Sequence, residues 1–378
     1  MDSQSKILIL YATAGHGHEK AAKAVAAALK EKHPQANVVL SDILTLCAPY
    51  YGASYRKSYL AMIRDMSWLW GFLYYGSDVS FIYRLLKPLR RLNNALLAKP
   101  LHQFIVAQNP DVIISTHFMS TEVASYLKRK GSSRARLVTV VTDYLPHYFW
   151  VGDGVDAYVC AIPEGKRELV KRGAPEDRIR IMGIPTDKKF SHALPRGELL
   201  LKHQVEDGVF TVLLTSGGAG VGAARKIAEA LLELDKPVQV LAVCGTNEAL
   251  KNQLTQLKAV RPRLKVFGFV DTMDELMQLS DVIVGKGGGL TVTEAMCKGK
   301  PMIIFQPVPG QESRNADCLS RASAAVTAGC FDDVIAKVKM FLNDPLKLKE
   351  YQETARRYAH PSSAVEIADL AVGLIPKT

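Results

Sequence analysis

No two cysteines of this 378-residue chain stand in a Cys-x-x-Cys pair. The six cysteines are scattered, at Cys47, Cys160, Cys244, Cys297, Cys318 and Cys330. Cysteine ligands of structural zinc normally come in closely spaced pairs, so this distribution argues against a zinc site. It is typical of buried, reduced thiols in a reducing compartment.

The chain also lacks any run of 18 or more apolar residues, which excludes a helix long enough to cross a bilayer. The apolar run at residues 7–10 is too short for the core of a secretory signal, and it leads directly into a glycine-containing loop. We therefore expect this run to be the first strand of the fold and not a targeting segment.

Acidic residues are fewer than basic ones: 37 Asp and Glu stand against 48 Lys and Arg, a formal net charge of +11. Such an excess favours an acidic partner, namely nucleic acid, an anionic membrane or a phosphorylated substrate. The 48% hydrophobic and 22% charged residues are ordinary for a soluble globular protein, and the length suits two domains better than one.

Short apolar runs alternate with helical stretches throughout the chain. The strand-like runs lie near residues 6–11, 36–41, 111–115, 136–142 and 156–160, and again near 209–215, 238–243, 264–267, 281–284 and 301–305. Continuous apolar strands separated by helices indicate parallel sheets covered on both faces. We predict an α/β fold of two Rossmann-like, doubly wound domains, residues 1–185 and 186–360, followed by a C-terminal helix within 361–378.

The junction of a strand with three glycines is the clearest sign of a binding site. The strand-like run 281–284 is followed by Lys286, three glycines and a helical stretch from Thr291 to Lys298. Glycines let backbone N–H groups approach an anion, and the helix N-terminus adds about half a positive charge. Glu294 lies about one turn further along and suits the hydroxyls of a ribose. The pattern predicts a nucleotide site.

A second glycine cluster, at residues 217–222, also follows a strand and precedes a helix. Its spacing is not Gly-x-Gly-x-x-Gly, and the next strand ends without the acidic residue expected to hold a ribose of NAD. This departure disfavours a dinucleotide site.

Aromatic residues are concentrated in residues 50–83, which hold 11 of the 29 in the chain. Basic residues accompany them. Three aromatic residues and four basic residues of this region are expected to contact a membrane or the acceptor: Trp68, Trp70, Phe72, Arg84, Lys87, Arg90 and Arg91. Aromatic rings and long cations together favour the headgroup zone of a membrane. A helical pair packed into the core and a platform for single-stranded nucleic acid are the alternatives. The run 68–75 is too apolar for the latter.

Several motifs resemble one known family. Gly-Gly-Gly-Leu-Thr-Val-Thr-Glu-Ala at 287–295, followed by Pro-Val-Pro-Gly-Gln-Glu at 307–312, is similar to the donor half of the sugar transferases that make glycosyldiacylglycerols. These are the bacterial diacylglycerol glucosyltransferases and the plant-type monogalactosyldiacylglycerol synthases, relatives of the transferase that completes lipid II. Ala-Gly-His-Gly-His at 14–18 resembles the family's Gly-x-Gly-His loop, and Val-Thr-Asp at 141–143 with His147 and Trp150 resembles another segment.

The resemblance spans nearly the whole chain and implies the GT-B architecture, two doubly wound domains facing across a cleft. It implies that the first domain holds the lipid and the base, that the second holds a UDP-sugar, and that the last helix crosses back to the first domain. The donor-binding residues that we expect are Gly17, Ser216, Gly217, Gly218, Phe269, Val270, Lys286, Gly287, Gly288, Gly289, Leu290, Thr291, Glu294, Gln311, Glu312 and Asn315. Taken alone, Phe267 and Phe269 would more often be core residues.

Sugar transfer requires that the departing diphosphate be neutralised and that the attacking hydroxyl lose its proton. Helix N-termini with Lys286 can serve the first need, and the chain lacks the Asp-x-Asp pair of metal-dependent sugar transferases, so we predict that neither a metal nor another cofactor is required. The candidate bases are His18, Asp143 and His147, with His18 ranked first and Asp143 second. The two histidines are candidates because imidazole titrates near neutrality. Asp143 and His147 could instead orient His18 or bind the acceptor. The resemblance implies an inverting reaction.

We therefore predict a peripheral protein at the cytoplasmic face of the membrane that transfers a hexose, glucose in preference to galactose, from a UDP-sugar to diacylglycerol. Its expected partners are the UDP-hexose, diacylglycerol and anionic membrane lipids, and not nucleic acid. Galactosyl transfer, transfer to a polyprenyl-linked lipid and a UDP-sugar-binding sensor without turnover are the alternatives.

Overall fold

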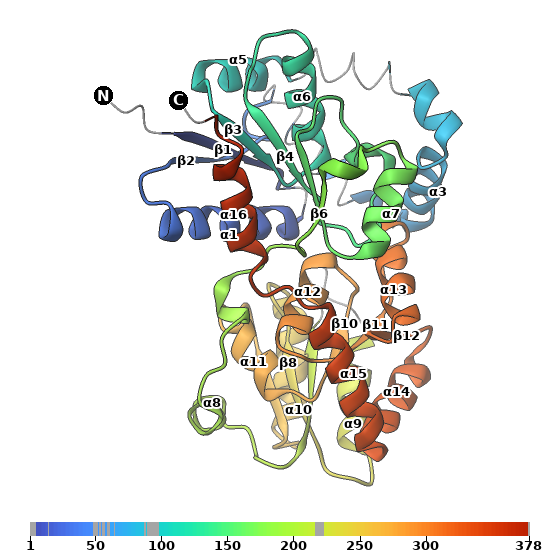
Figure 1. Ribbon diagram of the computed structural model, residues 1–378. Helices are drawn as coiled ribbons and strands as arrows, with labels where there is room; N and C mark the ends of the chain where they lie inside the picture. The colour runs from blue at the N-terminus through green and yellow to red at the C-terminus, as the bar shows by residue number, and fades with distance from the viewer. Residues whose placement is uncertain are drawn as a thin grey trace. The chain divides into compact units, whose positions relative to one another are not determined.

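The computed structural model describes residues 5–13, 15–47, 52, 54, 57–58, 61–63, 65–86, 88, 98–215 and 223–376 (Figure 1). The chain forms two compact units. The first comprises Met1–Lys188, Pro309–Gln311 and His360–Thr378, and the second comprises Lys189–Val308 and Glu312–Ala359.

The first unit is built on a six-stranded parallel sheet. Its strands are β1 (Lys6–Tyr11), β2 (Asn37–Asp42), β3 (Val112–Ser115), β4 (Arg136–Val140), β5 (Ala157–Cys160) and β6 (Ile179–Ile181). Its helices are α1 (His16–Lys32), α3 (Ser67–Ser77), α5 (Lys99–Gln108), α6 (Phe118–Arg129), α7 (Pro163–Lys171) and α16 (Ser363–Gly373), with a 3₁₀ helix at Tyr148–Trp150. The strand order is β2-β1-β3-β4-β5-β6.

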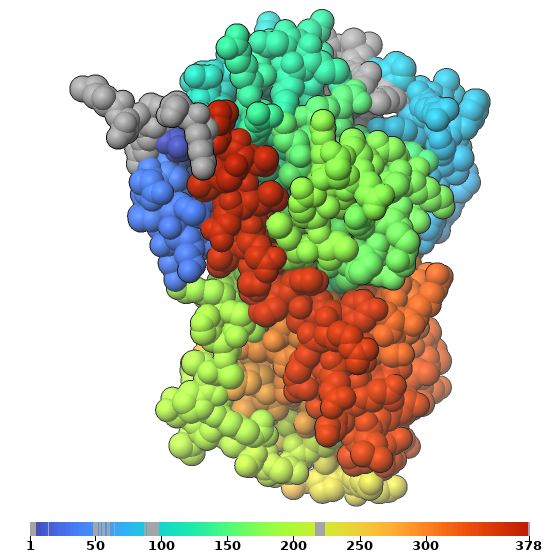
Figure 2. Space-filling view, viewed as in Figure 1, coloured from blue at the N-terminus to red at the C-terminus, as the bar shows by residue number. Residues whose placement is uncertain are grey.

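Helices cover both faces of this sheet, because alternate residues of each strand point to opposite sides. Ile7 and Ile9 pack with the small and branched residues of α1 and α16, whereas Leu8 and Leu10 pack with α5 and α6. The C-terminal α16 lies directly against α1, through Ala364, Ile367, Ala368 and Ala371 (Figure 2). The last helix therefore completes the hydrophobic core of the unit that the first strand begins.

The second unit has its own six-stranded parallel sheet. Its strands are β7 (Phe210–Thr215), β8 (Val238–Val243), β9 (Leu264–Phe267), β10 (Val282–Gly285), β11 (Met302–Phe305) and β12 (Ala325–Ala328). Its helices are α8 (Arg196–His203), α9 (Ala223–Leu232), α10 (Glu248–Lys258), α11 (Met273–Leu279), α12 (Gly289–Cys297), α13 (Gln311–Arg321), α14 (Phe331–Asn343) and α15 (Pro345–Tyr358). Residues of α9, α10 and α14 pack on one face of the sheet.

The strand order β12-β11-β10-β7-β8-β9 makes this second sheet a doubly wound one in which β7, the first strand, lies beside β10, the fourth. Where the connections that leave two neighbouring strands run to opposite faces of the sheet, a crevice forms at the carboxyl edge between those strands. That point lies between β7 and β10 in the second unit and between β1 and β3 in the first.

The α/β fold of two Rossmann-like domains is thus confirmed, and each of the ten apolar runs predicted as strands forms one, with small shifts at the ends. The sequence prediction missed β6 and β12, and α12 begins at Gly289, not at Thr291. In the described part of the chain, the search for a helix sufficiently long and apolar to span a bilayer found none.

Candidate functional site

The loops that follow β1 and β3 carry the first candidate side chain to the crevice of the first sheet. His18 is the third residue of α1, which starts just beyond β1 after the extended Gly15. Thr116 follows β3 directly, and its hydroxyl donates to the backbone carbonyl of His18 over 3.0 Å. The helix start that bears His18 is therefore tied to the neighbouring strand.

The imidazole of His18 has a defined orientation. Its Nδ1 lies 2.7 Å from the backbone carbonyl of Thr116 and 3.0 Å from the hydroxyl oxygen of Thr142. A carbonyl oxygen can only accept, so the proton of the neutral ring lies on Nδ1. The lone pair then lies on Nε2, and no described residue hydrogen-bonds to that nitrogen. This is the tautomer that a general base requires.

The surroundings keep His18 neutral. Burial lowers its pKa below the ordinary histidine value, although the carboxylate of Asp143 and the bond to the Thr116 carbonyl oppose the shift. His117 stands edge-on to the His18 ring, with centroids 4.7 Å apart. Burial, and secondarily the field of His18, hold the pKa of His117 well below its usual value, so this neighbour is neutral as well.

Asp143 is buried beside this pair and is held by an indole. The Nε1–H of Trp150 donates to its Oδ2 over 2.9 Å. Asp143 therefore influences His18 through its electric field, while its carboxylate is directed by Trp150. The structure brings together both of these predicted residues.

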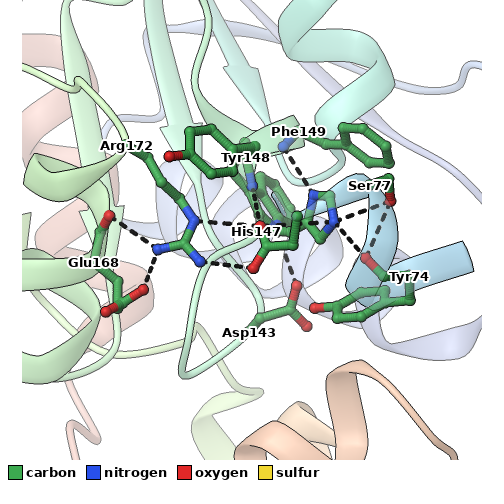
Figure 3. A network of polar contacts seen from close by, with 10 residues as sticks. Tyr74, Ser77, Asp143, His147, Tyr148, Phe149, Glu168 and Arg172 are labelled. Atoms are coloured by element: carbon green, nitrogen blue, oxygen red, sulfur yellow. Dashed lines mark hydrogen bonds and ion pairs between the residues drawn. The ribbon is translucent and has the colours of Figure 1, made fainter. Parts of the chain in front are cut away.

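His147 occupies a different kind of position. Its Nδ1 accepts the N–H of Phe149, which caps the 3₁₀ helix, and its Nε2 lies 3.1 Å from the carbonyl oxygen of Tyr74 in α3. Ser77 of the same helix lies 3.3 Å from Nε2 (Figure 3). With one nitrogen accepting from the backbone and the other facing a carbonyl, the geometry favours a structural role and leaves His18 as the candidate base.

A buried ion pair reinforces the attachment of α3. Asp78, the C-cap of that helix, receives a bond of 2.7 Å from Arg172 and another of 2.9 Å from the backbone N–H of Tyr148. Arg172 also pairs with Glu168 of α7, and its guanidinium lies over the ring of Tyr148 (Figure 3). Burial works to raise the pKa of Asp78, but the bonds from Arg172, the nearby His147 and the Tyr148 amide hold it below the usual value.

The opposite face of α3 is exposed and apolar. Trp68 and Phe72 are 73% and 72% exposed, and Phe81, in the helical residues 80–86, is 75% exposed. Other large apolar side chains exposed on this segment are Met66, Leu73, Tyr75, Val79, Ile82, Leu85 and Leu86. Trp70 is partly buried, and Arg84 is exposed. The remaining predicted cations, Lys87, Arg90 and Arg91, lie outside the described residues.

The second candidate region lies at the crevice of the other sheet, between β7 and β10. The glycine loop with Ser216, Gly217 and Gly218 lies outside the described residues. After β10, Lys286 and Gly287 lead to Gly288, the N-cap of α12, which has no side chain to accept from the helix N-terminus. A Cβ at Gly287 would lie 3.0 Å from the side chain of Ile304 and 3.3 Å from the Glu312 carbonyl, so glycine avoids two tight contacts there.

Four predicted sugar-binding or ribose-binding side chains lie on α12 and α13. Glu294 is buried on α12, and Asn315 is buried on α13. Gln311 and Glu312 do not lie on an open loop, because α13 begins at Gln311. Burial raises the pKa of Glu312. The carboxylate accepts a hydrogen bond of 2.8 Å from the backbone N–H of Val308, and this bond and the charge of Lys286 oppose the rise.

Gly17 precedes His18 in the first turn of α1, and Leu290 and Thr291 lie in the first turn of α12. Phe269 and Val270 follow β9 at the edge of the second sheet. Phe269 is 70% exposed, so the core alternative for this residue is wrong. Among the described residues, no group of three or more His, Cys, Asp and Glu is placed to hold a metal ion.

Sequence reasoning did not assign roles to Thr116, His117, Thr142, Asp78 or Arg172. Thr116 and Thr142 could have been suspected, because each stands within two residues of a strand's carboxyl end, where α/β sheets place their ligands. Asp78 and Arg172 had no signal, because their pairing joins residues 94 positions apart.

Comparisons with known proteins identify the fold and the family of the chain. Residues 18–186 match the family model for monogalactosyldiacylglycerol (MGDG) synthase, and residues 211–367 match the glycosyltransferase family 28 C-terminal domain. The structure is similar to a crystal structure of Acinetobacter baumannii MurG, with a TM-score of 0.63 and 16% identity over 98% of this chain and 99% of that one. It is also similar to Anabaena Alr3699/HepE in complex with UDP-glucose, with a TM-score of 0.53 and 16% identity over 98% and 96%. The fold is that of a GT-B glycosyltransferase.

Sequence relatives define the family within that class. The processive diacylglycerol beta-glucosyltransferase of Bacillus pumilus (strain SAFR-032) is 32% identical over 94% of this chain and 91% of the relative. The protein of the same name from Bacillus subtilis (strain 168) is 31% identical over 91% and 88%. The chain belongs to the family of these diacylglycerol glucosyltransferases, as the resemblance implied.

We predict that Asp78→Asn lowers the free energy of unfolding by about 2 kcal/mol at pH 7, because it removes one of the two carboxylates that pair with the largely buried guanidinium of Arg172. Since the folded pKa of Asp78 is depressed, its contribution is present above the unfolded value near pH 4 and is lost as the pH falls through the lower folded value. Urea titrations followed by circular dichroism at pH 7 and below pH 4 measure both effects. Asp153→Asn, at a half-exposed pair with Arg129, is the control and should cost about 1 kcal/mol or less. Equal losses for the two variants would contradict the anchoring role.

Proposed function

We propose that this chain transfers glucose from UDP-glucose to the free hydroxyl of diacylglycerol and forms a β-glucosyldiacylglycerol. The observation that carries the proposal is the tautomer of His18, which puts the lone pair on Nε2, at a residue that lies by the crevice of the first sheet. The names of the full-length relatives support glucose and diacylglycerol as the two substrates. The first unit would supply the base and the lipid contact, and the second would supply the nucleotide site.

The reaction follows from the residues in place. Nε2 of His18 takes the proton of the acceptor hydroxyl while that oxygen forms a bond to the anomeric carbon of the donor. The bond from this carbon to the phosphate oxygen breaks, and its electron pair leaves with UDP. Attack from the side opposite the phosphate gives a β-glycoside from an α-linked donor. The field of Asp143 stabilises the imidazolium that forms.

The departing diphosphate needs positive charge. The N–H groups at the start of α12 and the ammonium of Lys286 provide it, and the N-cap Gly288 has no side chain that would compete. Buried Glu294 is positioned further along α12 for the ribose, and Gln311, Glu312 and Asn315 at the start of α13 for the hexose. These charges support a reaction that needs no metal ion.

The exposed apolar face of α3 and residues 80–86 supports a peripheral contact with the membrane that holds the acceptor. Its indole and phenyl rings suit the headgroup zone, and Arg84 with the net charge of +11 suits anionic lipids. The Asp78–Arg172 pair fixes the C-terminal end of the same helix to the end of α7.

The proposed activity is tested with purified protein, radiolabelled UDP-glucose and vesicles of phosphatidylcholine and phosphatidylglycerol that contain diacylglycerol. We expect label in the chloroform phase and a hexosyl-diacylglycerol by mass spectrometry, with equal rates in the presence of EDTA. UDP-galactose or a polyprenyl phosphate-linked acceptor used in preference would identify the alternative transferases. Binding of UDP-glucose without any transfer would support the sensor and overturn the proposal.

We predict that His18→Gln lowers kcat about 10³-fold while the Kd for UDP, measured by calorimetry, stays within about twofold. His16→Gln, at an exposed position two residues earlier, is the control and should be nearly normal. In the wild-type protein kcat/KM should fall as the pH decreases through a value below 6.5, because burial lowers the His18 pKa and only the neutral ring is a base. Near-normal turnover of His18→Gln would end its candidacy.

We predict that Trp68→Ser combined with Phe72→Ser reduces sedimentation with anionic vesicles at least about 10-fold, since each buried aromatic side chain contributes roughly 1.5–3 kcal/mol. The control is Leu201→Ser with Val260→Ser, two equally exposed apolar residues of the second unit. Unchanged sedimentation of the α3 variant, at an unchanged affinity for UDP, would exclude this face as the membrane contact.

A further inference from the structure

Nδ1 of His18 faces two oxygen atoms, and neither belongs to a carboxylate. One is the Thr116 backbone carbonyl at 2.7 Å, and the other is the Thr142 hydroxyl at 3.0 Å. The nearby acid, Asp143, directs its Oδ2 to the indole of Trp150 instead. The side chain that orients the ring is therefore an uncharged threonine, one position before the acid.

We infer that Thr142 is a positioning residue for His18, whose hydroxyl oxygen shares the Nδ1–H with the Thr116 carbonyl and so keeps the Nε2 lone pair directed at the acceptor hydroxyl. The inference rests on the proposed function for its catalytic meaning. Its geometric part rests only on contacts within the first unit.

The burial of Thr142 and the contacts of Thr116 show that the fold determines the position of Thr142 relative to His18. Thr142 is 7% exposed and lies two residues beyond the end of β4, so its backbone position is set by the sheet. Thr116 makes two contacts with the same histidine: its backbone carbonyl lies by Nδ1 of the ring, and its hydroxyl donates to the backbone carbonyl of His18. The imidazole thus lies between the ends of β3 and β4 and has little rotational freedom.

The hydroxyl of Thr142 has a second consequence, for the charge of the ring. When Nε2 takes a proton, the positive charge spreads to Nδ1–H, and oxygen acceptors at Nδ1 stabilise this cation more than the neutral ring. The groups that face His18 are Asp143, whose field favours the cation, and the neutral His117, whose ring stands edge-on to it. Removing the hydroxyl should therefore lower the pKa of His18 and misalign the base.

The same strand offers a matched control. Thr139 in β4 is fully buried, and its hydroxyl lies 3.1 Å from that of Thr121, with no contact to His18. Thr139→Val makes the chemical change that Thr142→Val makes, three residues away on the same strand line. Thr142→Ser keeps the hydroxyl and removes only a methyl group, so it should restore the wild-type properties.

We expect Thr142→Val to lower kcat about 10-fold, with the KM for UDP-glucose within about twofold, and to shift the acid limb of kcat/KM to lower pH. The titration of His18 is followed by long-range ¹⁵N–¹H spectra of the full chain without substrate, and its signal is assigned by its absence in His18→Gln. In Thr142→Val we expect the midpoint to move so that the acid dissociation constant of His18 rises about threefold. Thr139→Val and Thr142→Ser should leave both midpoints at the wild-type value.

An unshifted His18 midpoint in Thr142→Val overturns the inference, as does an equal shift in Thr139→Val, which would reveal a general effect of removing a buried hydroxyl. The titration also separates this inference from the proposed function. If the wild-type chain transfers no glucose, the proposed function fails, and the spectra alone still decide whether Thr142 positions His18.

Discussion

Parallel strands all end at the same edge of a sheet, and where the strand order reverses, two neighbouring connections diverge and leave room for side chains from both. Each sheet of this protein has one such point. In the first unit it lies between β1 and β3, where Thr116 receives the ring of His18. In the second it lies between β7 and β10, where three glycines open α12. The candidate chemistry depends on these two reversals of strand order.

The strands themselves could be predicted because each central strand is buried on both faces and reads as a continuous apolar run. The two that were missed, β6 and β12, are both edge strands, although the edge strands β2 and β9 were predicted. Ile-Arg-Ile in β6 exposes two of its three residues, and Ala-Val-Thr-Ala in β12 has two small alanines and one polar residue, so neither has the apolar run of a central strand. Strand order could not be read at all, because it depends on contacts between segments distant in the chain.

The site shows the same division. The placement of His18 after the first strand was predicted from local pattern and resemblance. Its hydrogen-bond partners were not, because they lie 98 and 124 residues further along the chain. The local pattern made His147 a candidate base as well. In the structure, however, both of its ring nitrogens have partners: the neighbouring amide of Phe149 and the carbonyl of Tyr74, which lies 73 residues earlier in α3. A histidine's role depends on which nitrogen carries the proton, and that is a tertiary property.

The segment from Thr142 to Trp150 joins these observations. At its start Thr142 contacts the candidate base, and in its second half His147 and Tyr148 bind Tyr74 and Asp78 at the end of α3. A diacylglycerol hydroxyl lies in the headgroup zone of a membrane, so the proposed base must lie a short and fixed distance from the surface that is proposed to contact lipid. One nine-residue segment, with ends fixed by β4 and by a buried ion pair, can maintain such a distance with few adjustable torsions. The rigidity of this connection gives a physical reason for a charged pair as largely buried as Asp78 and Arg172, because the bonds that hold it offset part of its desolvation cost.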